Sequence, residues 1–361
     1  MVSPSQAVRV PLLDLKVQYR WVKDQVDEAV ARVHERGNYV MGEEVEAFEA
    51  EWAADCQANF CVGVSSGTDA IYLALRALHG DFPTRSLVWA PSATFIGTVE
   101  PVIRAGHRLR LTDVDDQAIM AEPEPGSSDI LLPVALYGRP VSWVEEQVRR
   151  GQAVIEDLAQ AHGHPLRGTL ACFSFYPTKN LGCAGQGGAV VTNDADLAEK
   201  IRQLRNHGEG DVRFRHEHLS GNYRLDELQA AILRAKLPHL GYWNYRRRGV
   251  ARTYIEMLSG LPGITVPQWH EEHVWHIFAL RSPRRNDLAA FLAERGIQTA
   301  VRYPLALHQQ PALEKSVRDS QFPVASAWAR ENLSLPIFPE LEDADVDYVG
   351  KAVREWAEMR A

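Results

Sequence analysis

AVIEDLAQAHGHPLRGTLACFSFYPTKN, residues 153–180, contains two short apolar runs that each lead to a reactive side chain. The first predicted strand, residues 153–156, is followed at once by Asp157, and the second, residues 171–175, is followed closely by Lys179. Apolar runs of this length are typical of buried strands. Strand ends in α/β sheets present side chains to ligands, so both residues are candidates for a functional site.

Outward from this stretch, short apolar segments alternate with helical patterns. Strands are predicted at 60–64, 87–90, 130–134, 153–156, 171–175 and 188–192, and helices at 68–78, 95–105 and 143–149. Two amphipathic helices come before them, the first over 21–36 and the second around Val45, Phe48 and Trp52. Alternation of this kind predicts a mainly parallel sheet covered by helices on both faces.

The rest of the chain is more helical. Helices are predicted at 225–237 and 240–258, followed by a turn cluster at 260–263, a strand at 274–280, a helix at 287–295, a strand at 298–302 and a closing helix. We therefore expect a large domain over residues 1–240. Residues 241–361 would supply a long connecting helix and a small α+β domain.

The composition excludes several classes of protein. The chain has 361 residues, 45% of them hydrophobic, and a formal net charge of -8, so a nucleic-acid partner is not expected. No stretch has the apolar length of a membrane span, and the N-terminus lacks the apolar core of a signal peptide. The four cysteines fit neither a metal site nor a disulfide framework. We expect a soluble cytoplasmic protein without a resident metal.

Three features suggest a common chemistry. A partly desolvated Lys179 would have a lowered pKa and could form a Schiff base with an aldehyde. A carboxylate such as Asp157 would keep the ring nitrogen of pyridoxal phosphate protonated, and strand alternation turns Glu156 to the opposite face. The segment Ser65-Ser-Gly-Thr-Asp-Ala70 opens a helix, where anions bind. Taken singly, each feature is also explained by a surface lysine, a helix cap or an ordinary helix start.

The sequence resembles the DegT-type sugar-nucleotide aminotransferases over nearly its whole length. The stretches that carry the resemblance are GNYVMGEEVEAFE at 37–49, SSGTDA at 65–70, PSATFIGT at 91–98, IEDLAQAHG at 155–163, SFYPTKNLG at 174–182, GNYRLDELQAA at 221–231 and SLP at 334–336. The resemblance implies the α/β fold of the fold-type I enzymes that use pyridoxal phosphate, the aspartate aminotransferase-like fold. Its sheet is of the seven-stranded type.

The resemblance also implies roles for individual residues. Lys179 would carry the cofactor, Asp157 would pair with its ring nitrogen, and Gln160 would lie near its ring hydroxyl. The remaining cofactor contacts are Phe95, stacked on the ring, and Gly67, Thr68 and Ser174 at the phosphate. Asn222 would reach that phosphate from the partner subunit of a homodimer with shared active sites.

The substrate contacts are less regular. Arg224 is a candidate for the donor carboxylate. The family usually reads His-Tyr-Pro-x-Pro-Leu-His near the substrate, whereas residues 302–308 read RYPLALH. Tyr303 and His308 keep their places in that pattern, and Arg302 replaces the first histidine. Its guanidinium would either contact a diphosphate or carboxylate, or lie in solvent.

The resemblance implies transfer of an amino group from L-glutamate to a nucleotide-linked keto-deoxysugar at C3 or C4, with the opening PLLDLKVQYR slightly favouring C3. Transamination of a cyclic polyol ketone is an alternative. A dehydratase is a second, although such relatives carry histidine in place of the lysine. A regulator that binds the cofactor is a third, although no basic DNA-binding module is evident.

Overall fold

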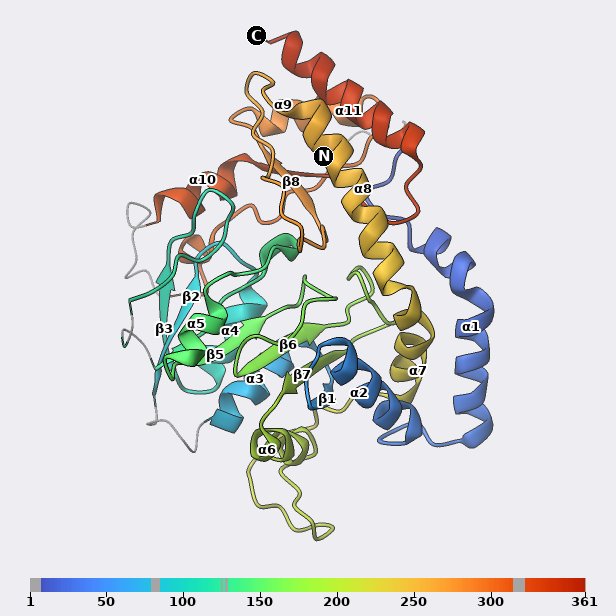
Figure 1. Cartoon of the computed structure of the whole chain (residues 1–361), viewed down its shortest axis with the longest axis vertical. Coiled ribbons are helices and arrows are strands. Elements are labelled where there is room, and N and C mark those ends of the chain that lie inside the picture. Colours follow the sequence, from blue (N-terminus) through green and yellow to red (C-terminus); the bar gives the residue numbers. More distant parts are fainter. Residues whose placement is uncertain (1–7, 79–84, 125, 127–128, 314–321, 361) are drawn as a thin grey trace.

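A computed structural model describes residues 8–78, 85–124, 126, 129–313 and 322–360 (Figure 1). The helices are α1 (Leu15–Arg36), α2 (Glu43–Asp55), α3 (Gly67–Leu78), α4 (Ile96–Arg104), α5 (Val144–Arg149), α6 (Ala195–Arg205), α7 (Glu227–Lys236), α8 (Leu240–Leu258), α9 (Arg285–Ala293), α10 (Pro323–Glu331) and α11 (Asp343–Glu358). The strands are β1 (Phe60–Val64), β2 (Leu87–Pro91), β3 (Arg108–Thr112), β4 (Ile130–Leu131), β5 (Ala153–Asp157), β6 (Leu170–Ser174), β7 (Gly188–Thr192), β8 (Phe278–Arg281) and β9 (Asn332–Leu335).

The described residues form a seven-stranded sheet in the order β1-β7-β6-β5-β4-β2-β3. Neighbouring strands are parallel except around β7, which is antiparallel to both β1 and β6. The strands β1, β2, β5 and β6 therefore run in one direction, and their carboxyl ends meet at the same edge. This confirms the predicted fold, a mainly parallel sheet between helices.

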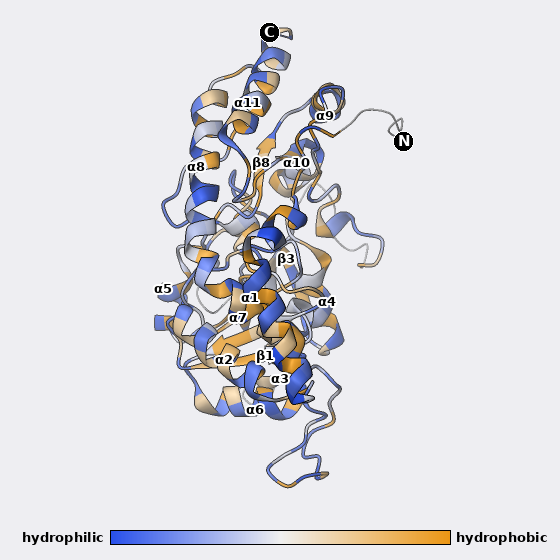
Figure 2. Cartoon of the chain, turned by 90° about the vertical axis from the view of Figure 1, so that its right-hand side faces the viewer, coloured by the Kyte–Doolittle hydropathy of each residue, from blue (hydrophilic) through white to orange (hydrophobic). Residues whose placement is uncertain are grey.

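Strand alternation distributes the core over the two faces of the sheet. In β6, Leu170 and Cys172 pack with α3 and α6, while Ala171 and Phe173 pack with α2 and α7. Viewed from the α1 side, the strands behind α2 and α7 are largely hydrophobic (Figure 2). Because both faces are covered, the strands contain continuous apolar runs.

A buried carboxylate joins two of the covering helices. The Glu227 side chain, at the start of α7, accepts hydrogen bonds from the backbone N–H groups of Gly42, Glu44 and Val45 at 2.8, 3.0 and 3.0 Å. These groups belong to the first turn of α2 and have no partner within that helix. A single side chain therefore caps α2 and fixes it against α7.

A second core lies toward the C-terminus. It combines Val10 with residues of α8, α9 and α11 and with the antiparallel pair β8 and β9. The helix α8 connects this core to the sheet, because Leu240 packs in the core of the sheet and Leu258 in the second core. The domain boundary predicted between residues 240 and 241 falls at the start of α8 and stays a prediction.

Three strand predictions need correction. The predicted strand 298–302 is wrong: only Ala300 makes a bridge there, to Ser334, and the Arg302 N–H donates to the Asn332 side chain. The strand predicted from 274 begins only at Phe278, because the N–H groups of Val274 and Ile277 bond to carbonyls at Gly138 and Tyr137. The strand predicted over 130–134 ends at Leu131, two residues before Pro133, which has no N–H to donate.

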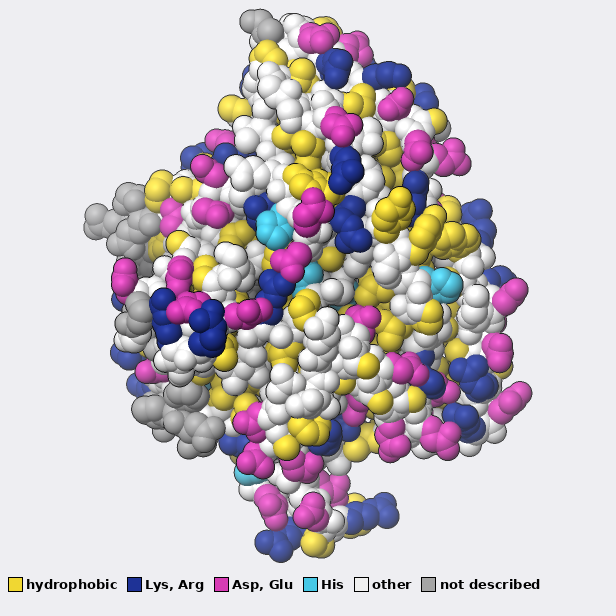
Figure 3. All heavy atoms as spheres, in the orientation of Figure 1, with side chains coloured by type: hydrophobic (Ala, Val, Ile, Leu, Met, Phe, Trp, Pro, Cys, Tyr) yellow, Lys and Arg dark blue, Asp and Glu magenta, His cyan; other side chains and the backbone are white. Residues whose placement is uncertain are grey.

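In the part of the chain that the structure describes, no helix combines the length and the apolar character that a membrane crossing requires. The face of the molecule seen in Figure 3 carries acidic and basic side chains interspersed with one another.

Candidate active site

A cavity of about 490 Å³ lies at the edge of the sheet where the parallel strands end. The segments that follow β1, β2, β5 and β6 form most of its wall, and residues from the C-terminal part close it. It contains most of the residues singled out from the sequence: Gly67, Thr68, Phe95, Asp157, Gln160, Ser174, Lys179, Arg302 and Tyr303. The topology therefore brings together side chains that lie more than two hundred residues apart in the chain.

Asp157 is the last residue of β5 and is buried. One carboxylate oxygen accepts a hydrogen bond from the Thr98 hydroxyl at 2.7 Å, and the other accepts one from the Ala159 N–H at 3.0 Å. Burial raises the pKa of this carboxyl group, and the two hydrogen bonds and Lys179 oppose the rise. Asp157 is thus an oriented buried acid beside a cation. The adjacent Glu156 faces the other side and accepts from the Arg167 and Gly168 N–H groups.

Lys179 lies in the loop that joins β6 to the antiparallel β7. The loop is closed at its base by a hydrogen bond of 2.8 Å from the Phe175 N–H to the Gly187 carbonyl. Desolvation lowers the pKa of Lys179 from 10.5 to about 8; Asp157 opposes this shift and Arg302 adds to it. Near neutral pH the uncharged amine, which is the nucleophilic form, is therefore far more populated in Lys179 than in an ordinary lysine.

The start of α3 forms a cradle for an anion. A Cβ atom on Gly67 would lie 2.6 Å from the Ser174 Cβ, so only glycine fits between α3 and β6. A Cβ on Gly97 would likewise lie 2.8 Å from the Thr68 hydroxyl oxygen. Helix N-termini offer free N–H groups and a positive dipole end to anions. The cradle thus has the donors and the close packing that a phosphate group needs.

Phe95 and Tyr303 are two of the aromatic side chains that line the cavity with Asp157. The Phe95 ring is 51% exposed although its residue precedes a buried helix, and its centroid lies 5.4 Å from that of Tyr303. The Tyr303 hydroxyl accepts a hydrogen bond from the side-chain amide nitrogen of Gln160 at 3.3 Å. The side-chain oxygen of Gln160 accepts one from the Tyr137 N–H at 2.7 Å. An exposed flat ring in the same cavity as a buried acid suits the stacking of an aromatic cofactor.

Three of the predicted residues lie elsewhere. Asn222 is exposed, and Arg224 donates to the Asn206 side chain at 3.0 Å; neither lines the cavity. His308 is buried outside the cavity, within hydrogen-bond distance of the Ser92 and Ser326 hydroxyl groups at 2.5 and 3.0 Å. Their assigned roles stay predictions.

The structure adds residues that the sequence analysis missed. Thr98 orients Asp157, and His276 lines the cavity beside Lys179. Thr98 belongs to the quoted stretch 91–98, so its position was available but its partner was not. His276 lies in a histidine-rich stretch with no local pattern that singles it out.

The chain is similar to known sugar transaminases over nearly its whole length. It is 43% identical over 379 residues to dTDP-3-amino-3,4,6-trideoxy-alpha-D-glucose transaminase of Streptomyces venezuelae, covering 99% of both chains. It is 37% identical to dTDP-3-amino-3,6-dideoxy-alpha-D-galactopyranose transaminase of Aneurinibacillus thermoaerophilus, covering 96% of this chain and 99% of the other.

Among solved structures, that of S. venezuelae DesV in complex with a ketimine intermediate superposes with a TM-score of 0.91 at 42% identity. The match covers 98% of this chain and 99% of that one. The model of the DegT/DnrJ/EryC1/StrS aminotransferase family matches residues 21–354. With the fold, the cavity and these matches in agreement, the chain belongs to the DegT/DnrJ/EryC1/StrS aminotransferase family.

Proposed function

We propose that the protein binds pyridoxal 5'-phosphate on Lys179 and moves an amino group from L-glutamate to a nucleotide-linked keto-deoxysugar. The observation that carries this proposal is the pairing of a lysine whose pKa falls to about 8 with the buried Asp157, in one cavity with an anion cradle. The names of the two relatives favour C3 as the aminated carbon.

The cavity fits the cofactor on three counts. The glycine at position 67 lets the start of α3 approach Ser174, so Gly67, Thr68 and Ser174 would hold the phosphate. The exposed face of Phe95 would cover the ring. Asp157 would face the ring nitrogen, and Gln160 would lie near the ring hydroxyl. When bound, pyridoxal phosphate supplies an electron-withdrawing ring that makes the proton on the donor α-carbon acidic.

The side chains of the chain itself would then act on protons and charge. Asp157, held by Thr98 and the Ala159 N–H, would stabilise positive charge on the ring nitrogen. The Lys179 amine would take the proton from the donor α-carbon and return it to the carbon on the other side of the transferred nitrogen, since a pKa near the working pH suits both steps. Tyr303 and Phe95 would limit the access of water to these atoms.

We propose that the working form is a homodimer with shared sites. Residues 206–221, here called the arm, project beyond α6 (Figure 1), and Figure 3 shows charged side chains of both signs along this projection. Yet Val212, Phe214 and Leu219 in the arm are 58, 76 and 93% exposed. Apolar side chains in a projecting segment are usually covered by a partner. Asn222 follows directly on the arm, where it would reach the partner's phosphate site.

The proposal is tested by incubating the protein with pyridoxal phosphate, L-glutamate and the 3-keto precursors of the two amino sugars named above. We expect an amino sugar and 2-oxoglutarate, identified by mass spectrometry. Lys179→Ala should abolish the product, and Lys179→Arg, which keeps the charge, should not restore it.

A wild-type protein that leaves both sugars unchanged would refute the substrate assignment. A deoxygenated sugar without amino transfer would identify a dehydratase, and amination of a cyclic polyol ketone alone would identify the other alternative.

A further inference from the structure

A chain of buried polar side chains connects α8 to the cavity wall. The Asn244 amide nitrogen donates to the His162 carbonyl at 2.8 Å, and its oxygen accepts from the Asn180 amide at 2.9 Å. The Asn180 amide nitrogen also donates to the Val274 carbonyl at 3.0 Å, and its oxygen lies 3.0 Å from Nδ1 of His276. Asn180, Asn244 and His276 are all buried.

The two backbone carbonyls fix the direction of every bond in this chain. A carbonyl only accepts, so the Asn244 and Asn180 nitrogens must face the His162 and Val274 carbonyls. Each amide then has only its oxygen left, and the Asn180 oxygen must accept a proton from Nδ1 of His276. A neutral imidazole has one N–H, so Nε2 of His276 carries a lone pair.

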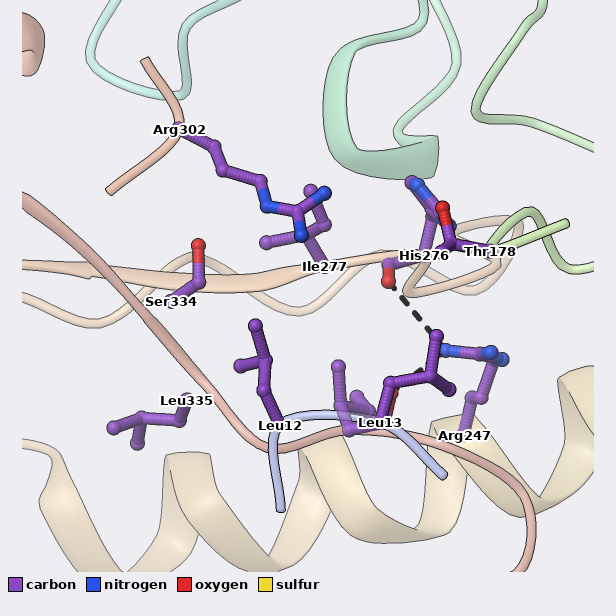
Figure 4. Close-up of a pocket in the computed structure, with 10 residues that line it drawn as sticks. Leu12, Leu13, Thr178, Arg247, His276, Ile277, Arg302, Ser334 and Leu335 are labelled. Carbon is purple, nitrogen blue, oxygen red and sulfur yellow. Dashed lines mark hydrogen bonds between the residues drawn. The ribbon is translucent and has the colours of Figure 1, made fainter. Parts of the chain in front are cut away.

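His276 lines the main cavity and also a side pocket of about 40 Å³ next to it. In Figure 4 the side chain of Arg302 extends toward the region occupied by Ile277, Thr178 and His276. Burial, together with Lys179, Arg247 and Arg302, holds the pKa of His276 well below its usual value, so the ring stays neutral. Within the described residues, neither Nε2 of His276 nor the Arg302 guanidinium has a hydrogen-bond partner.

We infer that His276 and Arg302 together bind a hydroxyl group of the acceptor sugar, on a carbon next to the one that is aminated. A hydroxyl group is able to donate to the Nε2 lone pair and to accept from the guanidinium at the same time. A carboxylate can accept from the guanidinium but has no proton to donate to Nε2. An ammonium can donate to Nε2 but cannot accept from the guanidinium. This assignment rests on the proposed function and makes His276 a specificity-determining residue for a hydroxylated sugar.

The two substrates of the reaction differ in whether they can make this contact. L-Glutamate has no hydroxyl group, so the contact would form only in the half-reaction with the sugar. A sugar that lacks the hydroxyl would leave the lone pair of the buried His276 and the half-buried Arg302 guanidinium without this partner. A site rejects an analogue strongly when its polar groups are left unpaired in this way.

Two variants of His276 separate the cavity contact from the buried chain. His276→Asn places an amide near the position of Nδ1 and keeps the bond to Asn180, but presents nothing at Nε2. His276→Gln places its amide near the position of Nε2 and keeps an acceptor in the cavity. The cofactor-loaded protein is mixed separately with three amino donors. Two are amino sugars, which run the sugar half-reaction in reverse: dTDP-3-amino-3,6-dideoxygalactose has a C4 hydroxyl, and dTDP-3-amino-3,4,6-trideoxyglucose has no C4 hydroxyl. The third is L-glutamate, which runs the other half-reaction.

We expect His276→Asn to lower kcat/KM about tenfold for a sugar that makes the contact, the effect of one hydrogen bond, while L-glutamate changes less than about twofold. His276→Gln should recover part of the loss. A loss confined to the first sugar assigns the C4 hydroxyl, and an equal loss with both sugars assigns the C2 hydroxyl. An equal loss with L-glutamate, or no loss with either sugar, overturns the inference.

The tautomer has a readout that is independent of turnover. In protein labelled with ¹⁵N in its histidine rings, the signals that His276→Asn removes should show a protonated Nδ1 and a lone pair on Nε2. A proton on Nε2 overturns the inference, even where the kinetics agree. If the wild-type protein converts neither sugar, the proposed function fails while this spectrum still reports the state of the ring.

Discussion

At the scale of single residues, an anion and a cation act on the pKa of Lys179 in opposite senses. Burial disfavours its ammonium form and brings its pKa to about 8, Asp157 favours that form, and Arg302 disfavours it. The balance leaves the amine ready to react near neutral pH without removing its ability to carry a proton.

A pH prediction follows for loading of the cofactor-free protein. The uncharged amine attacks the aldehyde, so the loading rate should rise with pH and level off above about 8, rather than near the ordinary lysine value of 10.5. The measurement is the growth of visible absorbance after mixing with pyridoxal phosphate at several pH values. Lys179→Ala is the control and should show no growth. A midpoint above pH 10 would contradict the burial of Lys179.

The neighbours of Lys179 should move this midpoint in opposite directions. Asp157→Asn removes a charge that raises the pKa of Lys179, so the midpoint should fall below 8. Arg302→Gln removes a charge that lowers the pKa, so the midpoint should rise. The same absorbance assay measures both variants. If Arg302→Gln has no effect, the guanidinium does not face the lysine.

Asp157 and Lys179 were predicted from a local pattern, because Asp157 comes at the end of a buried strand and Lys179 comes soon after the next one. The sequence did not predict Thr98 as the partner of Asp157, or His276 as a wall residue. The state of His276 depends on Asn180 and Asn244, which lie 96 and 32 residues away along the chain. No periodicity within one element reports a hydrogen-bond chain of that kind.

At the scale of elements, the junction of α3 with β6 has no free space. Gly67→Ala should cost about 1–3 kcal/mol of folding free energy, because the new Cβ would displace backbone and side chain at Ser174. It should also weaken cofactor binding, measured by titration with pyridoxal phosphate. Gly249→Ala, exposed on α8 with no atom within 4 Å of the added Cβ, is the matched control. The control should gain about 0.5–1 kcal/mol of folding free energy, because alanine favours a helix more than glycine does. If both variants lost the same folding free energy, close packing against Ser174 would not be the cause.

The Glu227 cap gives a second prediction for the elements. Glu227→Gln keeps the size of the side chain but removes a charge that accepts three backbone N–H groups, so we expect a loss of about 1–3 kcal/mol. Denaturant unfolding measures it. The exposed Glu256→Gln on α8 should change stability by less than about 0.5 kcal/mol. Similar values for the two variants would mean that the cap contributes nothing.

Most strands of the sheet were predicted within a few residues because both faces are buried and their apolar runs are continuous. The edge strand β3 was missed, since its alternation of Arg108 and Arg110 with leucines is short and its outer side is open. β9 was missed because it buries Asn332 and Ser334, polar residues that obscure its pattern. The false strand at 298–302 has the right residue types but lacks a partner along most of its length.

At the scale of the whole molecule, the proposed dimer can be tested by mixing two defective proteins. Lys179→Ala removes the lysine, and Asn222→Asp places a negative charge where the partner's phosphate would bind. If Asn222 serves the neighbouring site, each mixed dimer has one intact site, and random exchange should restore about a quarter of wild-type activity. The measurement is transaminase activity after subunit exchange.

Unmixed variants, treated in the same way, are the control and should stay inactive. If Asn222 served the site of its own chain, every site in the mixture would carry a defect and no activity would return. The exposed arm was not predicted, because Val212, Phe214 and Leu219 are residue types that usually lie in a core, and only the structure shows that they are exposed.

The reversed direction of β7 has an evolutionary consequence. The segment 175–187, which carries Lys179, joins β6 to β7, and these two strands are antiparallel neighbours. Both ends of the segment are therefore fixed side by side, and the hydrogen bond from the Phe175 N–H to the Gly187 carbonyl closes it. An inserted or deleted residue in this segment would therefore move the lysine. The two ends of the arm at 206–221, in contrast, are held together by the bridge between Asn206 and Asn222, so a change of length within the arm need not move the rest of the fold. Among descendants of a common ancestor, changes in chain length should therefore accumulate in the arm and be nearly absent from the lysine loop.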